Sequence, residues 1–246
     1  MATKRTILEI ARRGVARAKR RPPTTLFDDT NANNLAVRTL LDEAGQELLD
    51  VRNSKSEPFT ALKKNFTITG QANTSVFALP EDFTAIIDES LWKEDSIYAP
   101  IGSLSESRWS YLQNSRISPG IIAPYFIIRK ADDNPLQDVL EFNPAPSPGE
   151  VFVLKYVSDL WLMNSDGFFS QIQSDSDISL FDDTLMELSL TYRFLEDDGQ
   201  DFSLALATYQ KKLDEITGRD SQPAAITLGG TFTTSIDDFR VVVNER

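Results

Sequence analysis

The chain contains neither cysteine nor histidine, and these two absences exclude several kinds of chemistry at once. Without them there is no disulfide bond, no thiol nucleophile, no zinc site built from Cys and His, and no Ser-His-Asp triad. An enzyme of this composition would depend on carboxylates, lysine, tyrosine or an oxygen-ligated metal ion. The absence of cysteine also suits a protein that is assembled in a reducing cytoplasm.

Long apolar runs are missing as well. No stretch of about 18 consecutive apolar residues is present, so the sequence predicts neither a membrane-spanning helix nor a membrane anchor. The basic N-terminus lacks the continuous apolar stretch of a secretory signal, so we expect no export by that route. Apolar residues still make up 41% of the chain, which is ordinary for a globular core. We therefore expect one compact body with appendages.

Charge is unevenly distributed over a chain whose net charge is −12. In residues 1–21 only Glu9 is acidic, whereas eight side chains are basic: Lys4, Arg5, Arg12, Arg13, Arg17, Lys19, Arg20 and Arg21. We interpret residues 1–27 as a basic arm that becomes ordered on a partner, with Arg12, Arg13, Arg17, Arg20 and Arg21 as its contact residues. Within this segment the apolar stripe Ile7, Leu8, Ile10, Ala11 and Val15 predicts a short basic helix at residues 6–20, and binding to a membrane surface or to nucleic acid is the alternative role.

Three helices are predicted from apolar residues at three- and four-residue steps. The first covers about residues 32–53, and the other two lie near residues 181–195 and 202–216. The short polar link at residues 197–201 makes the last two antiparallel neighbours. Together the three helices predict a bundle made from residues 28–62 and 178–220.

Residues 63–177 are predicted to be a β-rich insertion in this bundle. Alternating apolar residues and turn residues indicate several short antiparallel strands, a short helix after Ser103, and a polar loop at about residues 164–177. The predicted fold is therefore α+β, a three-helix bundle with an inserted antiparallel β-rich region and extended N- and C-terminal arms.

The C-terminal residues 221–246 are predicted to be an extended arm. They have β character but no partner strand nearby in the sequence, and a lone apolar strand is marginal in water. We expect it to add to a sheet edge in its own chain or in a neighbouring subunit. The contact residues predicted for the arm are Ile226, Leu228, Phe232, Ile236, Phe239, Val241 and Val243.

Candidate sites for chemistry are weak. Paired aspartates occur at residues 132–133, 182–183, 197–198 and 237–238, and a hydrolase would need two carboxylates at a fixed separation that sequence cannot place. Asp166, Asp175, Asp177 and Asp182 do not follow the spacing of a calcium loop. Trp92, Trp109 and Trp161 each lie in an apolar pattern that favours burial over sugar or base stacking. We therefore expect no catalytic residue, no cofactor and no metal.

The order of short motifs in the middle of the chain points to a family. Residues 77–83 read Phe-Ala-Leu-Pro-Glu-Asp-Phe, residues 100–101 are Pro-Ile before the Trp-bearing segment 104–109, and residues 140–146 read Leu-Glu-Phe-Asn-Pro-Ala-Pro. Over roughly residues 30–220 this layout resembles the head-to-tail adaptors of short-tailed bacteriophages, the tail tubular protein A or portal-adaptor family.

The resemblance implies a structural virion protein, assembled in the host cytoplasm, at the junction of head and tail. It implies a homo-oligomeric, dodecameric ring that docks under the portal protein, contacts tail nozzle or fibre proteins, and touches passing DNA only transiently as it leaves. The C-terminal arm would bind the portal or a neighbouring subunit, and the basic arm an acidic portal or tail surface.

Three other functions compete with this hypothesis. A carbohydrate-binding or other tail accessory module would use exposed tryptophans of the β-rich region. A carboxylate hydrolase would use one of the aspartate pairs. A DNA-binding regulator would rely on residues 1–21 and would bind duplex with steep salt dependence.

Overall fold

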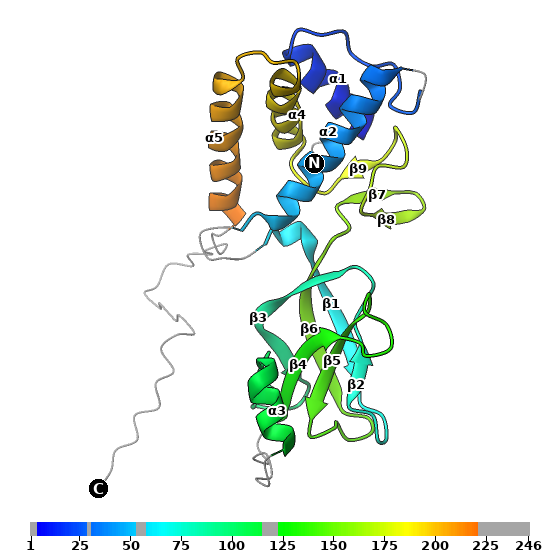
Figure 1. The fold of residues 1–246 in the computed structure, drawn as a ribbon, viewed down its shortest axis with the longest axis vertical. Coiled ribbons are helices and arrows are strands. Elements are labelled where there is room, and N and C mark those ends of the chain that lie inside the picture. The colour runs from blue at the N-terminus through cyan, green and yellow to red at the C-terminus, as the bar shows by residue number, and fades with distance from the viewer. Residues whose placement is uncertain (1–3, 29–30, 53–57, 115–122, 221–246) are drawn as a thin grey trace, which may run out of the picture.

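The computed structural model describes residues 4–28, 31–52, 58–114 and 123–220. The chain forms two parts that follow one another along the long axis of the molecule (Figure 1). One part is mainly helical, and the other is β-rich and carries one helix, α3 (Glu106–Asn114). The β-rich part is inserted between the second and fourth helices of the chain, so the polypeptide crosses the junction twice.

The helical part is organised around α4 (Asp183–Asp197), which packs against three other helices. These are α1 (Ile7–Arg17), α2 (Ala32–Asp50) and α5 (Ser203–Asp220). The central position of α4 explains why its residues from Leu185 to Tyr192 are all buried, polar ones included. Asp182 caps its N-terminus by accepting hydrogen bonds from the backbone N–H groups of Thr184 and Leu185.

The predicted three-helix bundle with an extended N-terminal arm is wrong. The segment that we interpreted as an arm contains α1, whose residues Ile7, Ile10, Ala11 and Val15 are fully buried in the main core. Thr6 and Glu9 form a capping box that starts this helix. The Lys4 ammonium donates hydrogen bonds to the backbone carbonyls of Ser179 and Phe181, which ties the start of the helix to the residues that precede α4.

The β-rich part contains two three-stranded antiparallel sheets. The first has the order β1 (Lys63–Thr69), β6 (Val151–Ser158), β3 (Phe83–Lys93), and the second the order β2 (Val76–Ala78), β5 (Asp138–Asn143), β4 (Tyr125–Lys130). Lys63 lies opposite Val157 and Thr69 opposite Val151, so β1 and β6 are paired along the whole of β1. A short 3-10 turn, η1 (Thr60–Leu62), leads into β1.

A third small sheet lies in the helical part beside α2 (Figure 1). It has the order β8 (Gly167–Phe169), β7 (Leu162–Asn164), β9 (Ile178–Ser179). The sequence predicts a loop over much of this region because its strands are only two or three residues long. An isolated bridge between Thr6 and Ile178 joins the sheet to the start of α1.

Each part has its own hydrophobic core. The helical core includes all four helices and Trp161, while the β-rich core lies between the two larger sheets around Phe142, Phe152 and Leu154. None of the helices in the described ranges is long and apolar enough to cross a membrane. The predicted C-terminal arm and its seven apolar contact residues lie outside the described residues.

Candidate interaction surface

The motif turn at residues 79–83 lies at the junction of the two parts. The Phe83 N–H donates to the carbonyl of Pro80, which closes the turn and places Asp82 beside the ends of β1 and β6. Asp82 accepts hydrogen bonds from the Lys64 ammonium at 2.8 Å, from the Ser158 hydroxyl at 2.6 Å and from the Tyr156 hydroxyl at 3.0 Å. The conspicuous sequence motif therefore anchors β3 to its own sheet at the junction.

The pKa values of the two aspartates in this cluster, Asp82 and Asp159, shift in opposite directions. Burial alone raises the pKa of Asp82, but the hydrogen bonds from Lys64, Ser158 and Tyr156 outweigh it and hold the pKa below its usual value. Burial and the bond to Asp82 raise the pKa of the Tyr156 hydroxyl. Burial, followed by the charge of Asp82, raises the pKa of Asp159. Among the described residues the Asp159 Oδ1 atom has no hydrogen-bond partner.

Two of the arginines predicted to contact a partner, Arg13 and Arg17, lie beside a buried carboxylate of α4. Glu187 is almost completely buried, and Arg17 donates to it at 3.1 Å from α1. Arg5 donates to its other oxygen at 2.6 Å, and Arg13 lies 3.8 Å away. These three cations neutralise one buried anion and tie α1 to α4, while Arg13 and Arg17 keep about half of their side chains exposed.

Of the remaining predicted basic residues, Arg12 lies in the middle of α1, and Arg20 and Arg21 follow its end. Arg12 donates to the carbonyls of Pro23 and Thr24, and Arg20 forms an ion pair with Asp198 at 2.8 Å. Arg21 is exposed. The structure therefore brings Arg13 and Arg17 together on one anion and spreads Arg12, Arg20 and Arg21 over separate positions.

An open groove separates the two larger sheets, and we call this groove the seam. One side is formed by residues 90–92 of β3 and the other by residues 99–102, with Phe126 of β4 at the base. The hollow between the two sides has a volume of about 350 Å³. The far side is fastened to β4 because the Ile101 N–H donates to Pro124 O, and Phe126 N–H donates to Ile101 O. Gly102 permits this close approach, since a Cβ there would overlap the Phe126 carbonyl.

The near side of the seam is the free edge of β3 within the described part of the chain. The Glu94 N–H donates to Val151 O, and Trp92 lies opposite Val153. Because backbone groups alternate in direction along an antiparallel strand, those of Leu91 and Lys93 point away from β6. The side chain of Trp92 is 51% exposed beside this edge.

Further large apolar side chains are exposed in the segment that follows β3. Ile97 is 86% exposed and Tyr98 51%, and Ile101 is also exposed. Contiguous exposed apolar side chains beside an unpaired strand edge are typical of a protein interaction surface. Tyr111 of α3, 65% exposed, lies in the next helix along the chain.

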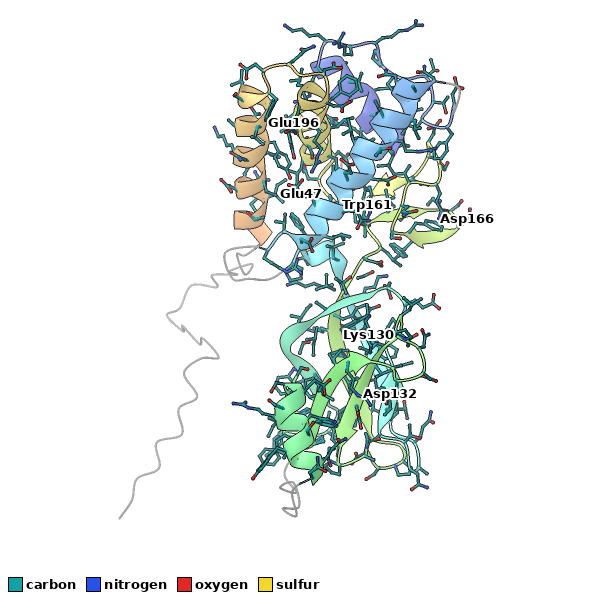
Figure 2. All side chains as sticks on the ribbon, in the orientation of Figure 1. Glu47, Lys130, Asp132, Trp161, Asp166 and Glu196 are labelled. Atoms are coloured by element: carbon teal, nitrogen blue, oxygen red, sulfur yellow. The ribbon has the colours of Figure 1, made fainter. Side chains whose placement is uncertain are left out.

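The three tryptophans have different roles. Trp161 is fully buried, donates its indole N–H to Ser170 O at 2.8 Å and stacks on Phe181 in the helical part (Figure 2). Trp109 of α3 is also buried. Trp92 alone of the three is exposed, so a surface of several tryptophans for sugar binding is not present.

The acidic residues considered for calcium serve the local backbone instead. Asp177 is fully buried and accepts hydrogen bonds from the N–H groups of Gln173 and Ser174. Asp175 accepts from Leu26 N–H, Asp182 caps α4, and Asp166 lies at the outer end of the small sheet (Figure 2). No group of three or more acidic residues within the described ranges is arranged to hold a metal ion.

Both aspartates of the predicted pair at residues 132–133 line a second hollow, of about 550 Å³. Asp132 and Glu141 both bind the Arg129 guanidinium there, at 2.5 Å and 3.0 Å. The hydrogen bond from Arg129 holds the pKa of Asp132 below its usual value. A general acid in glycoside hydrolysis needs a raised pKa, so Asp132 is unsuited to that role.

The sequence as a whole matches one family model over residues 5–229, which takes in both parts of the fold. That model describes the SU10 adaptor proteins. The chain belongs to the SU10 adaptor protein family. It is therefore a phage adaptor, a structural protein of the virion, and the family is not known for an enzymatic activity. No curated protein matches the chain.

The family assignment confirms the expected kinship with phage adaptors at this general level. The match does not extend to the narrower prediction, membership of the tail tubular protein A family of short-tailed phages. Sequence reasoning placed the partner contacts of this SU10 adaptor family member in its terminal segments and missed the seam. The available signal was residues 97–101, Ile-Tyr-Ala-Pro-Ile, an apolar segment that is too short and proline-interrupted for a buried strand.

Proposed function

We propose that this protein forms the head-to-tail adaptor ring of a short-tailed phage, joining the portal to the tail and lining the channel through which DNA leaves. The observation that carries the proposal is the family match over residues 5–229. The more detailed parts of the proposal, which are a dodecameric ring and contacts with tail nozzle or fibre proteins, rest on the resemblance of the motif layout to portal adaptors.

The charge of the chain supports a role as a channel wall. The net charge is −12, and an acidic surface repels phosphate, so DNA slides past with only transient contact. In the described structure the N-terminal arginines are largely paired with Glu187 and Asp198, which lessens the pull that they exert on DNA. Their exposed faces, with Arg12 and Arg21, are the proposed contact with an acidic portal or tail surface.

The C-terminal residues supply the proposed contact with the portal or a neighbouring subunit. Seven apolar side chains in an extended segment gain stability by adding to a sheet edge, and ordering such a segment on a partner links successive subunits. These residues are Ile226, Leu228, Phe232, Ile236, Phe239, Val241 and Val243.

Native mass spectrometry of the protein alone and with its cognate portal tests the proposal. We expect a portal-bound ring of fixed stoichiometry, which forms with the portal even if the free protein is monomeric. Absence of portal binding at micromolar concentrations would contradict the adaptor-ring proposal. Binding of oligosaccharides that quenches Trp92 fluorescence would then favour a carbohydrate-binding accessory module.

A further inference from the structure

We propose that in the free subunit the seam is the docking site for the C-terminal strand of the same chain, residues 239–243. This inference concerns the protein before assembly and does not depend on the ring. Phe239-Arg240-Val241-Val242-Val243 places three apolar side chains, those of residues 239, 241 and 243, on one face of an extended strand. The seam offers what such a strand needs.

The first requirement is a row of unpaired backbone groups. Among the described residues the outer edge of β3 supplies it, because Leu91 and Lys93 direct their N–H and C=O groups away from β6. A strand added there would lie between β3 and the segment at residues 99–102, which is itself fastened to β4. The addition would bridge the two larger sheets across their open side.

The second requirement is apolar surface for the side chains. Trp92 and Ile101 line the seam and are exposed, and Ile97 is exposed in the segment between them. Covering them removes apolar area from water on both partners, at roughly 25 cal/mol for each Å² buried. A strand with three apolar side chains on one face is therefore a better match than a polar segment.

The third requirement is that the strand can reach the seam. The end of α5 lies level with the junction, on the same side of the molecule as β3 and α3 (Figure 1). Residues 221–238 separate α5 from the strand and can span up to about 60 Å when extended. Since a tethered strand has a high local concentration at its own seam, the same chain is the favoured occupant when the protein is dilute.

Cross-linking can test this directly, because the natural chain contains no cysteine. We would introduce A99C and V241C into the full-length protein, one position in the seam and one in the strand. Under mild oxidation at low concentration we expect an intramolecular disulfide, detected by mass and by mobility on a non-reducing gel. Its rate of formation should not depend on protein concentration.

The matched control pairs V241C with L204C, which is 83% exposed at the start of α5 and much closer to residue 241 in sequence. A freely moving tail reaches residues 204 and 99 through the same tether, residues 221–240, because residues 203–220 form the helix α5, so the length of the loop favours neither position. We expect the A99C pair to form at least about tenfold faster. Equal rates would overturn the proposal, and so would disulfide-linked dimers that increase with concentration, which would assign the seam to a neighbouring copy.

A second measurement does not depend on cysteines. Trp92 is half exposed while Trp109 and Trp161 are buried, so fluorescence quenching by acrylamide reports mainly on Trp92. We expect V241D to increase quenching because a charged strand leaves the seam, and W92F to abolish the difference. Unchanged quenching in V241D would contradict docking, whereas portal binding in the same samples reports on the adaptor role separately.

Discussion

At the scale of single residues, α2 approaches the Trp161 ring closely at Gly45. A Cβ at Gly45 would overlap the indole ring, which is held by its hydrogen bond to Ser170 and by the stacked ring of Phe181. The indole therefore has no room to withdraw without breaking these contacts. Gly45 is needed for its lack of a side chain rather than for its backbone freedom.

We expect Gly45→Ala to lower the free energy of unfolding by about 1–3 kcal/mol through overpacking. The matched control is Gly218→Ala in α5, where an added Cβ meets no atom within 4 Å and should stabilise the helix by up to about 1 kcal/mol. Urea denaturation of the two variants measures both effects. Equal effects of the same sign would show that packing on Trp161 is not the cause.

The carboxyl of Asp159 gives a pH-dependent prediction. Its pKa is raised in the folded state by burial and then by the charge of Asp82, so the folded protein binds this proton more tightly than the unfolded chain. The associated stability is present below the unfolded pKa, near 3.9, and is lost as the pH rises through the folded pKa. At neutral pH the ionised group therefore destabilises the junction.

We expect Asp159→Asn to raise the free energy of unfolding at pH 7 by about 0.5–1 kcal/mol. The gain should shrink as the pH falls through the raised pKa of Asp159, because the natural carboxyl then becomes protonated. Unfolding curves of both proteins across this range measure the difference. Asp166→Asn, at an exposed position, is the same substitution away from the junction and serves as the comparison.

At the scale of elements, the union of α1 with α4 depends on one buried carboxylate. Glu187→Gln would leave Arg5, Arg13 and Arg17 facing a neutral side chain, and we expect a loss of about 2 kcal/mol, since the arginines remain partly solvated. Faster hydrogen exchange in α1 than in α5 would identify α1 as the helix that loosens. Glu196→Gln, exposed on the same helix (Figure 2), should leave both quantities unchanged.

The elements also show how far sequence reasoning reaches. The predicted helix at residues 32–53 corresponds to α2 at Ala32–Asp50, because Val37, Leu41, Ala44 and Leu48 form a regular buried stripe that is visible locally. The burial of α1 was missed because the anion that neutralises its arginines is more than 160 residues away, on α4. A basic helix looks like a free arm until its partner is placed beside it.

The same reasoning explains why the seam was missed. Strand positions follow from local alternation, but which edge stays unpaired depends on the order of strands in the sheets, and β3 pairs with β6 across more than 50 residues of chain. The Asp82 cluster was partly visible as a turn motif. Its partners Tyr156 and Ser158 belong to β6, more than 70 residues away, and the sequence near residue 82 does not predict them.

At the scale of the whole molecule, the acidic balance predicts weak contact with nucleic acid. We expect no measurable binding of a random duplex at about 0.15 M salt, because a net charge of −12 repels the phosphate backbone. Fluorescence anisotropy with a labelled duplex measures this. Tight binding that falls steeply with salt and disappears in an Arg12→Gln, Arg21→Gln variant would revive the DNA-binding alternative. Substitution is preferable to deletion of residues 1–21, which would remove α1 from the core.

The double crossing at the junction has a mechanical consequence. β1 enters the β-rich part and β6 leaves it at the same end, and the two lie side by side in full register. A force that pulls the helical part away from the far tip of the β-rich part is therefore shared by these two antiparallel strands. The force acts along the strands, so it does not break their hydrogen bonds one at a time. Such a coupling transmits tension without extending, which suits a component that must hold two large bodies together.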